Sequence, residues 1–234
     1  MNVYLLARTA HLCVLGEHVV ILDLRSGRYL GLPQEESATL GAWVQGWPIA
    51  PVSVESADGN PPAALRHLCD HGLLTTDPSL GKSAEPVRRS VRNTAYQKDR
   101  PAVAARIRIH HVVRMAWAIF FCVCAKRWMR LDRIVERVRR RKERGAAVIV
   151  SKEREAELLR IYHSLRPFFY STSQRCMLHC MALSEFLAGF GVYPEWVFGV
   201  RTKPFQAHCW LDRDGDSLTD SPLNVDRMTP IMIV

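Results

Sequence analysis

Residues 176–221 change from a helical to a strand-like hydrophobic pattern, and this change constrains the fold more than any other feature. Apolar residues repeat at helical spacing over residues 177–187, and Gly189 and Gly191 follow them. Strand-like residues 205–211 then lead through a turn signal around Asp214 into residues 217–221. A helix followed by a hairpin predicts an α+β fold for this part of the chain.

Cys176 stands at the predicted start of that helix. Residues 171–175 before it are rich in N-cap candidates, so we expect the thiol in the first helical turn. Unpaired backbone N–H groups and the helix dipole at that position favour the thiolate, which is the nucleophilic form. The same N–H groups can receive an oxyanion, and Gln174 is a further candidate donor.

His208 and Asp220 occupy the two predicted strands of the hairpin and are symmetric about Asp214. Residues opposite each other in such a hairpin have Cβ atoms about 4.5–5.5 Å apart. A carboxylate at that distance can orient the imidazole and stabilise its charged form. Together with Cys176, the arrangement predicts a Cys-His-Asp triad that attacks an acyl group.

Other roles for these residues remain open. A cysteine at the start of an apolar helix also fits a small buried hydrophobe, and a strand histidine also fits a structural role. A metal site from Cys176, Cys180, His208 and Cys209 is a further alternative. We expect it not to form, because His208 and Cys209 are neighbours on a strand and should point to opposite faces.

The composition agrees with an intracellular enzyme. The chain has 234 residues, long enough for two small domains, and we expect no signal peptide at its start. Its seven cysteines lack a disulfide-framework spacing, which favours reduced thiols and a cytoplasmic location. Apolar residues 115–125 form a run shorter than the roughly 20 residues of a membrane span, so we expect a buried helix there.

Positive charge is concentrated in the middle of the chain. Residues 82–144 contain 19 Lys and Arg against 5 Asp and Glu, with the densest run at residues 137–144. This run fits a solvated helix face, and an acidic partner surface is the functional alternative. No nucleic-acid-binding signature and no Gly-rich phosphate loop occurs in the sequence, so we expect neither nucleic acid nor a nucleotide cofactor.

The first eighty residues predict a separate small module. Short β-prone runs at residues 11–15, 18–24 and 27–32 indicate a three-stranded meander. Helical patterns follow at residues 34–45 and 61–71. We therefore expect a domain over residues 1–78, a linker over 79–103 that is rich in Pro, Ser, Lys and Arg, and a second domain over 104–234.

The segments 175–183, 197–201 and 204–210, the last of them containing Pro-Phe-x-Ala-His-x-Trp, resemble motifs of the lasso-peptide B proteins. The resemblance implies a winged-helix-like precursor-recognition domain followed by a papain/transglutaminase-like cysteine protease domain. It assigns the nucleophile to Cys176, the base to His208 and the orienting carboxylate to Asp220. Cys180 and Cys209 replace the smaller residues usual in the family, which leaves open a second reactive thiol.

By this resemblance the protein is a leader peptidase that takes up the leader of a precursor peptide as an added strand. Its other expected partner is an asparagine-synthetase-like lasso cyclase, to which any ATP requirement would belong, since no cofactor motif occurs here. Alternatives are an acyltransferase or transglutaminase with the same triad, and a non-catalytic peptide-binding adaptor. The residues expected to line the leader groove lie on the third strand and the later helix: Arg28, Tyr29, Leu30, Leu32, Ala64, Leu65 and Leu68.

Overall fold

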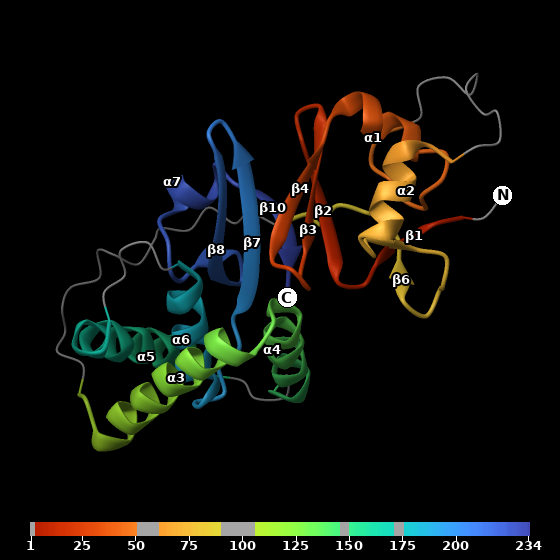
Figure 1. Ribbon diagram of the computed structural model, residues 1–234. Coiled ribbons are helices and arrows are strands. Elements are labelled where there is room, and N and C mark those ends of the chain that lie inside the picture. The colour runs from red at the N-terminus through yellow and green to blue at the C-terminus, as the bar shows by residue number, and fades with distance from the viewer. Residues whose placement is uncertain (1–2, 51–60, 90–105, 146–149, 171–175) are drawn as a thin grey trace. The chain divides into compact units, whose positions relative to one another are not determined.

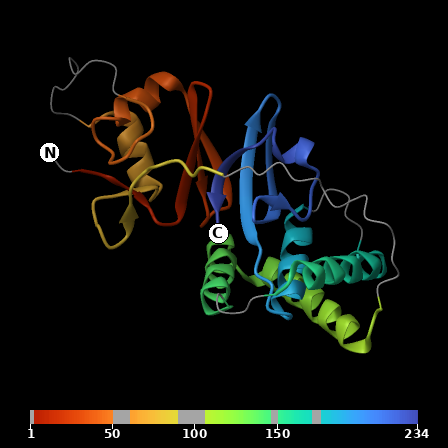
Figure 2. The ribbon, with the colours of Figure 1, turned by 180° about the vertical axis from the view of Figure 1, so that it is seen from behind.

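The structure is a computed structural model that describes residues 3–50, 61–89, 106–145, 150–170 and 176–234 (Figure 1). Helices and strands are mixed along the chain, which forms two compact units. The N-terminal unit consists mainly of Met1–Arg88, and the C-terminal unit consists mainly of the residues from Arg89 onward (Figure 2).

Among its described residues, the N-terminal unit contains two three-stranded sheets and two helices. The first sheet has the strand order β5-β1-β6 and the second has the order β2-β3-β4. The elements are β1 (Leu5–Ala7), β2 (Ala10–Leu15), β3 (His18–Asp23), β4 (Arg28–Leu32), α1 (Gln34–Leu40), α2 (Ala63–Asp70), β5 (Leu74–Thr75) and β6 (Gly81–Lys82).

Strands β2, β3 and β4 form the antiparallel meander that the sequence predicts. Leu15 pairs with His18 across the first turn, and Asp23 pairs with Arg28 across the second. Gly16 and Gly27 adopt positive φ values of 59° and 70° in these turns, a conformation that glycine adopts without steric cost. The inward residues of the meander pack with α1 and α2 in one hydrophobic core.

The other sheet of this unit is not predicted by the sequence pattern. Its strand β6 lies within residues 79–89 of the expected linker and pairs with β1. Ala84, just beyond β6, is fully buried in the core of the unit. This part of the expected linker is therefore packed against the module, whereas residues 90–103 of it lie outside the described residues.

The segment from Arg89 onward contains five α-helices among its described residues and a sheet with the strand order β10-β7-β8-β9, of which Val200–Gln206 and Thr229–Met232 are grouped with the N-terminal unit. Its elements are α3 (Ile109–Trp128), α4 (Leu131–Gly145), α5 (Lys152–Leu165), the 3-10 turn η3 (Arg166–Phe168), α6 (Cys176–Ala188), β7 (Glu195–Thr202), β8 (Phe205–Arg213), β9 (Asp216–Ser217), α7 (Pro222–Val225) and β10 (Thr229–Ile233).

Helix α6 is the central element of this unit. Every residue from His179 to Leu187 is buried, and α3 and α5 both pack against it. The prediction of a buried helix that starts at Cys176 is confirmed.

The prediction of a buried helix over residues 115–125 is wrong for one face of α3. Met115, Ala118 and Cys122 are buried, but Trp117 and Phe120 are exposed. By length and composition alone α3 could cross a membrane, although only 28% of its most apolar window is buried inside the protein. Its neighbours α5 and α6 cover one side and leave the other to solvent.

Arg89 connects the start of the C-terminal unit to its sheet. Its guanidinium donates to both carboxylate oxygens of Asp212 on β8, at 2.6 and 3.0 Å. The side chains of Arg89 and Asp212 are only 8% and 3% exposed. The same guanidinium lies 5.5 Å from the ring centroid of Trp210. Arg89 therefore holds the C-terminal half of β8 in place.

We expect Arg89→Ala to lower the free energy of unfolding by about 3–5 kcal/mol, because it leaves the buried Asp212 carboxylate without its partner. Urea unfolding followed by tryptophan fluorescence measures this change. The control is Arg130→Ala, which breaks an exposed ion pair with Asp132 and should cost less than about 1 kcal/mol. Equal effects of the two substitutions would contradict the role of Arg89.

Candidate active site

Cys176 is the first residue of α6 and is half-buried. The residues from His179 to Leu187 are buried, so the position of the thiol follows from the packing of the helix. The expected N-cap residues and the candidate oxyanion donor Gln174 lie outside the described residues.

His208 on β8 and Asp220 form a hydrogen-bonded pair. His208 Nε2 lies 2.5 Å from Asp220 Oδ2, and both side chains are partly buried. The other oxygen, Asp220 Oδ1, accepts from Asn224 Nδ2 at 3.0 Å and from the backbone N–H of Ser221 at 3.2 Å. The Asp220 carboxylate is therefore held through both of its oxygens. Because Nε2 of His208 is bonded to Asp220, Nδ1 is the ring nitrogen that remains to bond the Cys176 thiol.

The structure brings His208 and Asp220 together by a different route from the predicted one. The β8–β9 ladder pairs Asp212 with Ser217 and Arg213 with Asp216, and β9 ends at Ser217. This register is set by a two-residue turn, so Asp220 is not the cross-strand partner of His208. Instead, Asp220 lies in the segment between β9 and α7.

The electrostatics of the pair favour an imidazolium. Hydrogen bonds to Asp220 and then to the Cys176 thiol raise the pKa of His208 from 6.5 to about 9, against the effect of burial. Burial acts to raise the pKa of Asp220, but the hydrogen bonds from His208 and Asn224 lower it below its usual value. At neutral pH the pair is therefore imidazolium and carboxylate.

Cys176 contacts both His208 and Cys209. A hydrogen bond with the Cys209 thiol raises the pKa of Cys176 from 9.0 to about 12, burial adds to this effect, and the hydrogen bond with His208 opposes it. The expectation of a resting thiolate is therefore wrong for neutral pH. The expectation that only one of His208 and Cys209 can face Cys176 is also wrong, because strand alternation separates Cβ directions but leaves both side chains within hydrogen-bonding reach.

Trp210 supports His208 from within the same strand. The two rings are stacked, with centroids 6.2 Å apart and planes inclined by 21°. Trp210 is fully buried and needs Gly199 on β7, because a Cβ there would lie 2.7 Å from its ring. Gly199 therefore makes room for the tryptophan against which the candidate base rests.

Asn224 is a site residue that the sequence analysis does not predict, and Cys209, considered there as a metal ligand or a second reactive thiol, instead contacts the Cys176 thiol. Asn224 lies four residues after Asp220 and on a helix that starts between them, a spacing at which side chains meet. Cys209 is fully enclosed, and Cys180 Sγ donates to its carbonyl oxygen at 3.2 Å. The contacts of Cys209 arise because α6, which carries Cys176 and Cys180, packs against β8, and the sequence pattern alone does not show that packing.

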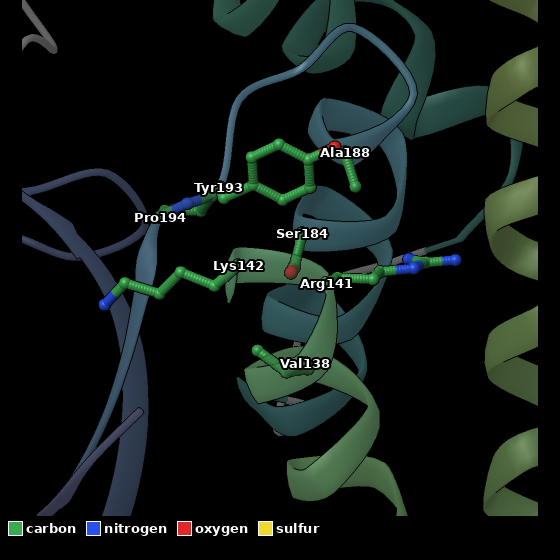
Figure 3. A pocket seen from close by; sticks show the side chains of 7 residues that line it. All are labelled: Val138, Arg141, Lys142, Ser184, Ala188, Tyr193 and Pro194. Atoms are coloured by element: carbon green, nitrogen blue, oxygen red, sulfur yellow. The ribbon is translucent and has the colours of Figure 1, made fainter. Parts of the chain in front are cut away.

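No group of three or more His, Cys, Asp or Glu side chains among the described residues is arranged to hold a metal ion. A small hollow between α4 and α6 is shown in Figure 3, and no triad residue lines it. Its two cationic lining residues, Arg141 and Lys142, are already paired with Glu185 and Glu195. We therefore assign no ligand to it.

The residues expected in the leader groove divide into two groups. For three of them the prediction of a groove position is wrong, because they are buried in the core of the N-terminal unit: Leu32, Leu65 and Leu68. The other four are exposed or half-buried on β4 and α2: Arg28, Tyr29, Leu30 and Ala64. The three buried leucines of β4 and α2 fill the core of the unit, so they are not available to line a groove for a ligand.

Residues 118–233 match the model of the transglutaminase-like superfamily. The C-terminal part of the chain is therefore a transglutaminase-like superfamily domain, a class that usually comprises cysteine-dependent enzymes. The match includes Cys176, His208 and Asp220. No significant match was found among curated proteins or among solved structures.

We expect the reactivity of Cys176 to rise with pH through about 9, because at lower pH the site holds both the thiol proton and the imidazolium proton. Cys209→Ala removes the largest cause of the raised thiol pKa and should shift this rise to lower pH. Mass spectrometry of the Cys176 peptide after timed iodoacetamide treatment measures the rate. Cys124→Ala is the matched control, and an identical pH profile for Cys209→Ala would show that Cys209 does not govern the thiol.

Proposed function

We propose that the protein is a cysteine peptidase that removes the leader from a lasso-peptide precursor. The observation that carries this proposal is the contact of Cys176 with His208, which is in turn held by Asp220, inside a transglutaminase-like domain. The substrate class rests on the resemblance of residues 175–183, 197–201 and 204–210 to the lasso-peptide B proteins.

In the proposed reaction, Cys176 in its thiolate form attacks the carbonyl carbon of the peptide bond between leader and core. The imidazolium of His208 then gives its proton to the leaving amine, and the leader is left as a thioester on Cys176. Neutral His208 takes a proton from water, the hydroxide attacks the thioester, and the thiol is restored. Asp220 stabilises the imidazolium in both halves of the reaction.

The N-terminal unit is proposed to bind the leader. Strand β4 is an edge strand of the β2-β3-β4 sheet, and an edge strand can pair with an extended peptide. Arg28 and Tyr29 supply exposed and half-buried side chains on this strand, and Leu30 is half-buried with part of its side chain packed against the core. Selectivity would then come from the leader, and the tether to the protease domain would supply a high effective concentration of the scissile bond.

The other proposed partner is an asparagine-synthetase-like lasso cyclase, which would use the freed core amine to close a macrolactam ring. Any ATP requirement would come from that enzyme. We propose a cytoplasmic setting, since all seven cysteines are free thiols in the structure.

We expect the wild-type protein, incubated with a cognate precursor and its cyclase, to release the leader, and Cys176→Ala to release none. Removal of a catalytic nucleophile leaves binding but abolishes the covalent step, so the loss should exceed about a thousandfold. Mass spectrometry of the reaction detects the free leader.

Cys124→Ala is the control for cysteine removal outside the site and should cleave normally. Equal processing by wild type and Cys176→Ala would overturn the peptidase and leave a non-catalytic adaptor. Attachment of an added primary amine to the leader's carboxyl end, in place of hydrolysis, would identify an acyltransferase that uses the same triad.

We expect Tyr29→Ala to weaken leader binding by about 5- to 30-fold, the effect of losing one aromatic anchor of an interface. Fluorescence anisotropy of a labelled leader measures the affinity. His18→Ala, an exposed substitution on β3, should leave the affinity unchanged. An unchanged affinity for Tyr29→Ala would place the leader elsewhere.

A further inference from the structure

Helix α3 presents an apolar stripe to solvent. Five large apolar side chains, spaced three or four residues apart, lie along one side of the helix and are more than half exposed: Ile109 (83%), Val113 (61%), Trp117 (52%), Phe120 (60%) and Val123 (59%). We name these five residues the α3 stripe. The rings of Trp117 and Phe120 are neighbours, with centroids 6.0 Å apart. An exposed patch of this kind marks a surface that binds something apolar.

The opposite side of α3 is engaged by the fold. Met115, Ala118, Cys122 and Ala125 are buried, and the helix packs against α5 and α6. Both ribbon views show α3 at the outer edge of the helical group, with α5 and α6 beside it (Figures 1 and 2). The helix cannot cross a bilayer without leaving this packing, but its outer side is available while the domain stays folded.

The charged residues of α3 itself are all positive. Between residues 106 and 131 the chain has six Lys and Arg and no Asp or Glu. Arg106 and Arg108 lie before the helix, and Lys126 and Arg127 lie in its last turn, so positive charge stands at both ends of the apolar stripe. Within the described residues, none of these four groups has an acidic partner.

We propose that the α3 stripe docks the protein on an anionic phospholipid surface, with α3 lying parallel to the membrane plane. The stripe would enter the boundary between headgroups and acyl chains, where Trp and other apolar side chains are favoured. The basic groups at its two ends would meet the lipid phosphates. This inference concerns the surface of the C-terminal unit and does not depend on the proposed peptidase activity.

A lipid surface fits the stripe better than a protein partner does. A stable protein interface uses about 20–30 residues on each side, whereas the stripe offers five large side chains on a single convex helix. A fluid lipid surface accommodates a convex ridge, and it supplies negative charge on both sides of the apolar region. Both properties match the stripe and its basic ends.

The test is co-sedimentation of the full chain with vesicles of phosphatidylglycerol and phosphatidylcholine, compared with pure phosphatidylcholine vesicles. We expect binding to the anionic vesicles that weakens as salt is added. Trp117→Glu with Phe120→Glu should lower the partition coefficient by about tenfold or more, because two charges would enter the apolar layer. Circular dichroism and a thermal melt establish that the variant is folded.

The matched control is Leu80→Glu with Phe168→Glu, which adds the same charge at two exposed apolar residues outside the stripe and should bind like wild type. No binding to anionic vesicles at low salt would overturn the proposal, as would equal binding by the stripe variant. A dimer in analytical ultracentrifugation that the stripe variant abolishes, without vesicle binding, would assign the stripe to a second copy instead. Cys176→Ala should bind vesicles normally, so failure of the peptidase proposal would not mimic failure here.

Discussion

The burial of α6 is the constraint on which the candidate site depends. Nine consecutive residues from His179 to Leu187 are enclosed, so the helix cannot shift along its axis without opening the core. That fixes Cys176 at the N-terminal end of the helix, where its side chain is half-buried. Strand β8 then has to bring His208 to the same end, and Trp210 and Arg89 hold this strand where the imidazole meets the thiol.

The site combines two opposing electrostatic effects. Asp220 stabilises the imidazolium form of His208, as a base that must carry a proton during acyl transfer requires. The Cys209 thiol and burial stabilise the protonated form of Cys176. A site with both protons in place is a poor nucleophile, and losing one of them gives the reactive thiolate–imidazolium pair. Cys209 thereby acts on the pKa of the Cys176 thiol although it does not belong to the triad.

The proposed function divides recognition and chemistry between the two units. The C-terminal unit holds the candidate triad within a transglutaminase-like domain. The N-terminal unit offers an edge strand, β4, whose accessible residues are fewer than the sequence pattern suggested, since Leu32, Leu65 and Leu68 are needed in its core. Recognition of a peptide there would have to rely mostly on backbone hydrogen bonds and on the side chains of Arg28, Tyr29 and Leu30.

The sequence by itself determined the features that arise from local patterns. Apolar periodicity placed the start of α6 at Cys176, and β-prone runs broken by Gly16 and Gly27 placed the three strands of the meander. Tertiary structure alone decided the rest: the contact of Cys209 with Cys176, the position of Asp220 beyond β9, and the exposed side of α3. These depend on which elements pack against each other, and side-chain periodicity shows that a face is apolar without showing what covers it.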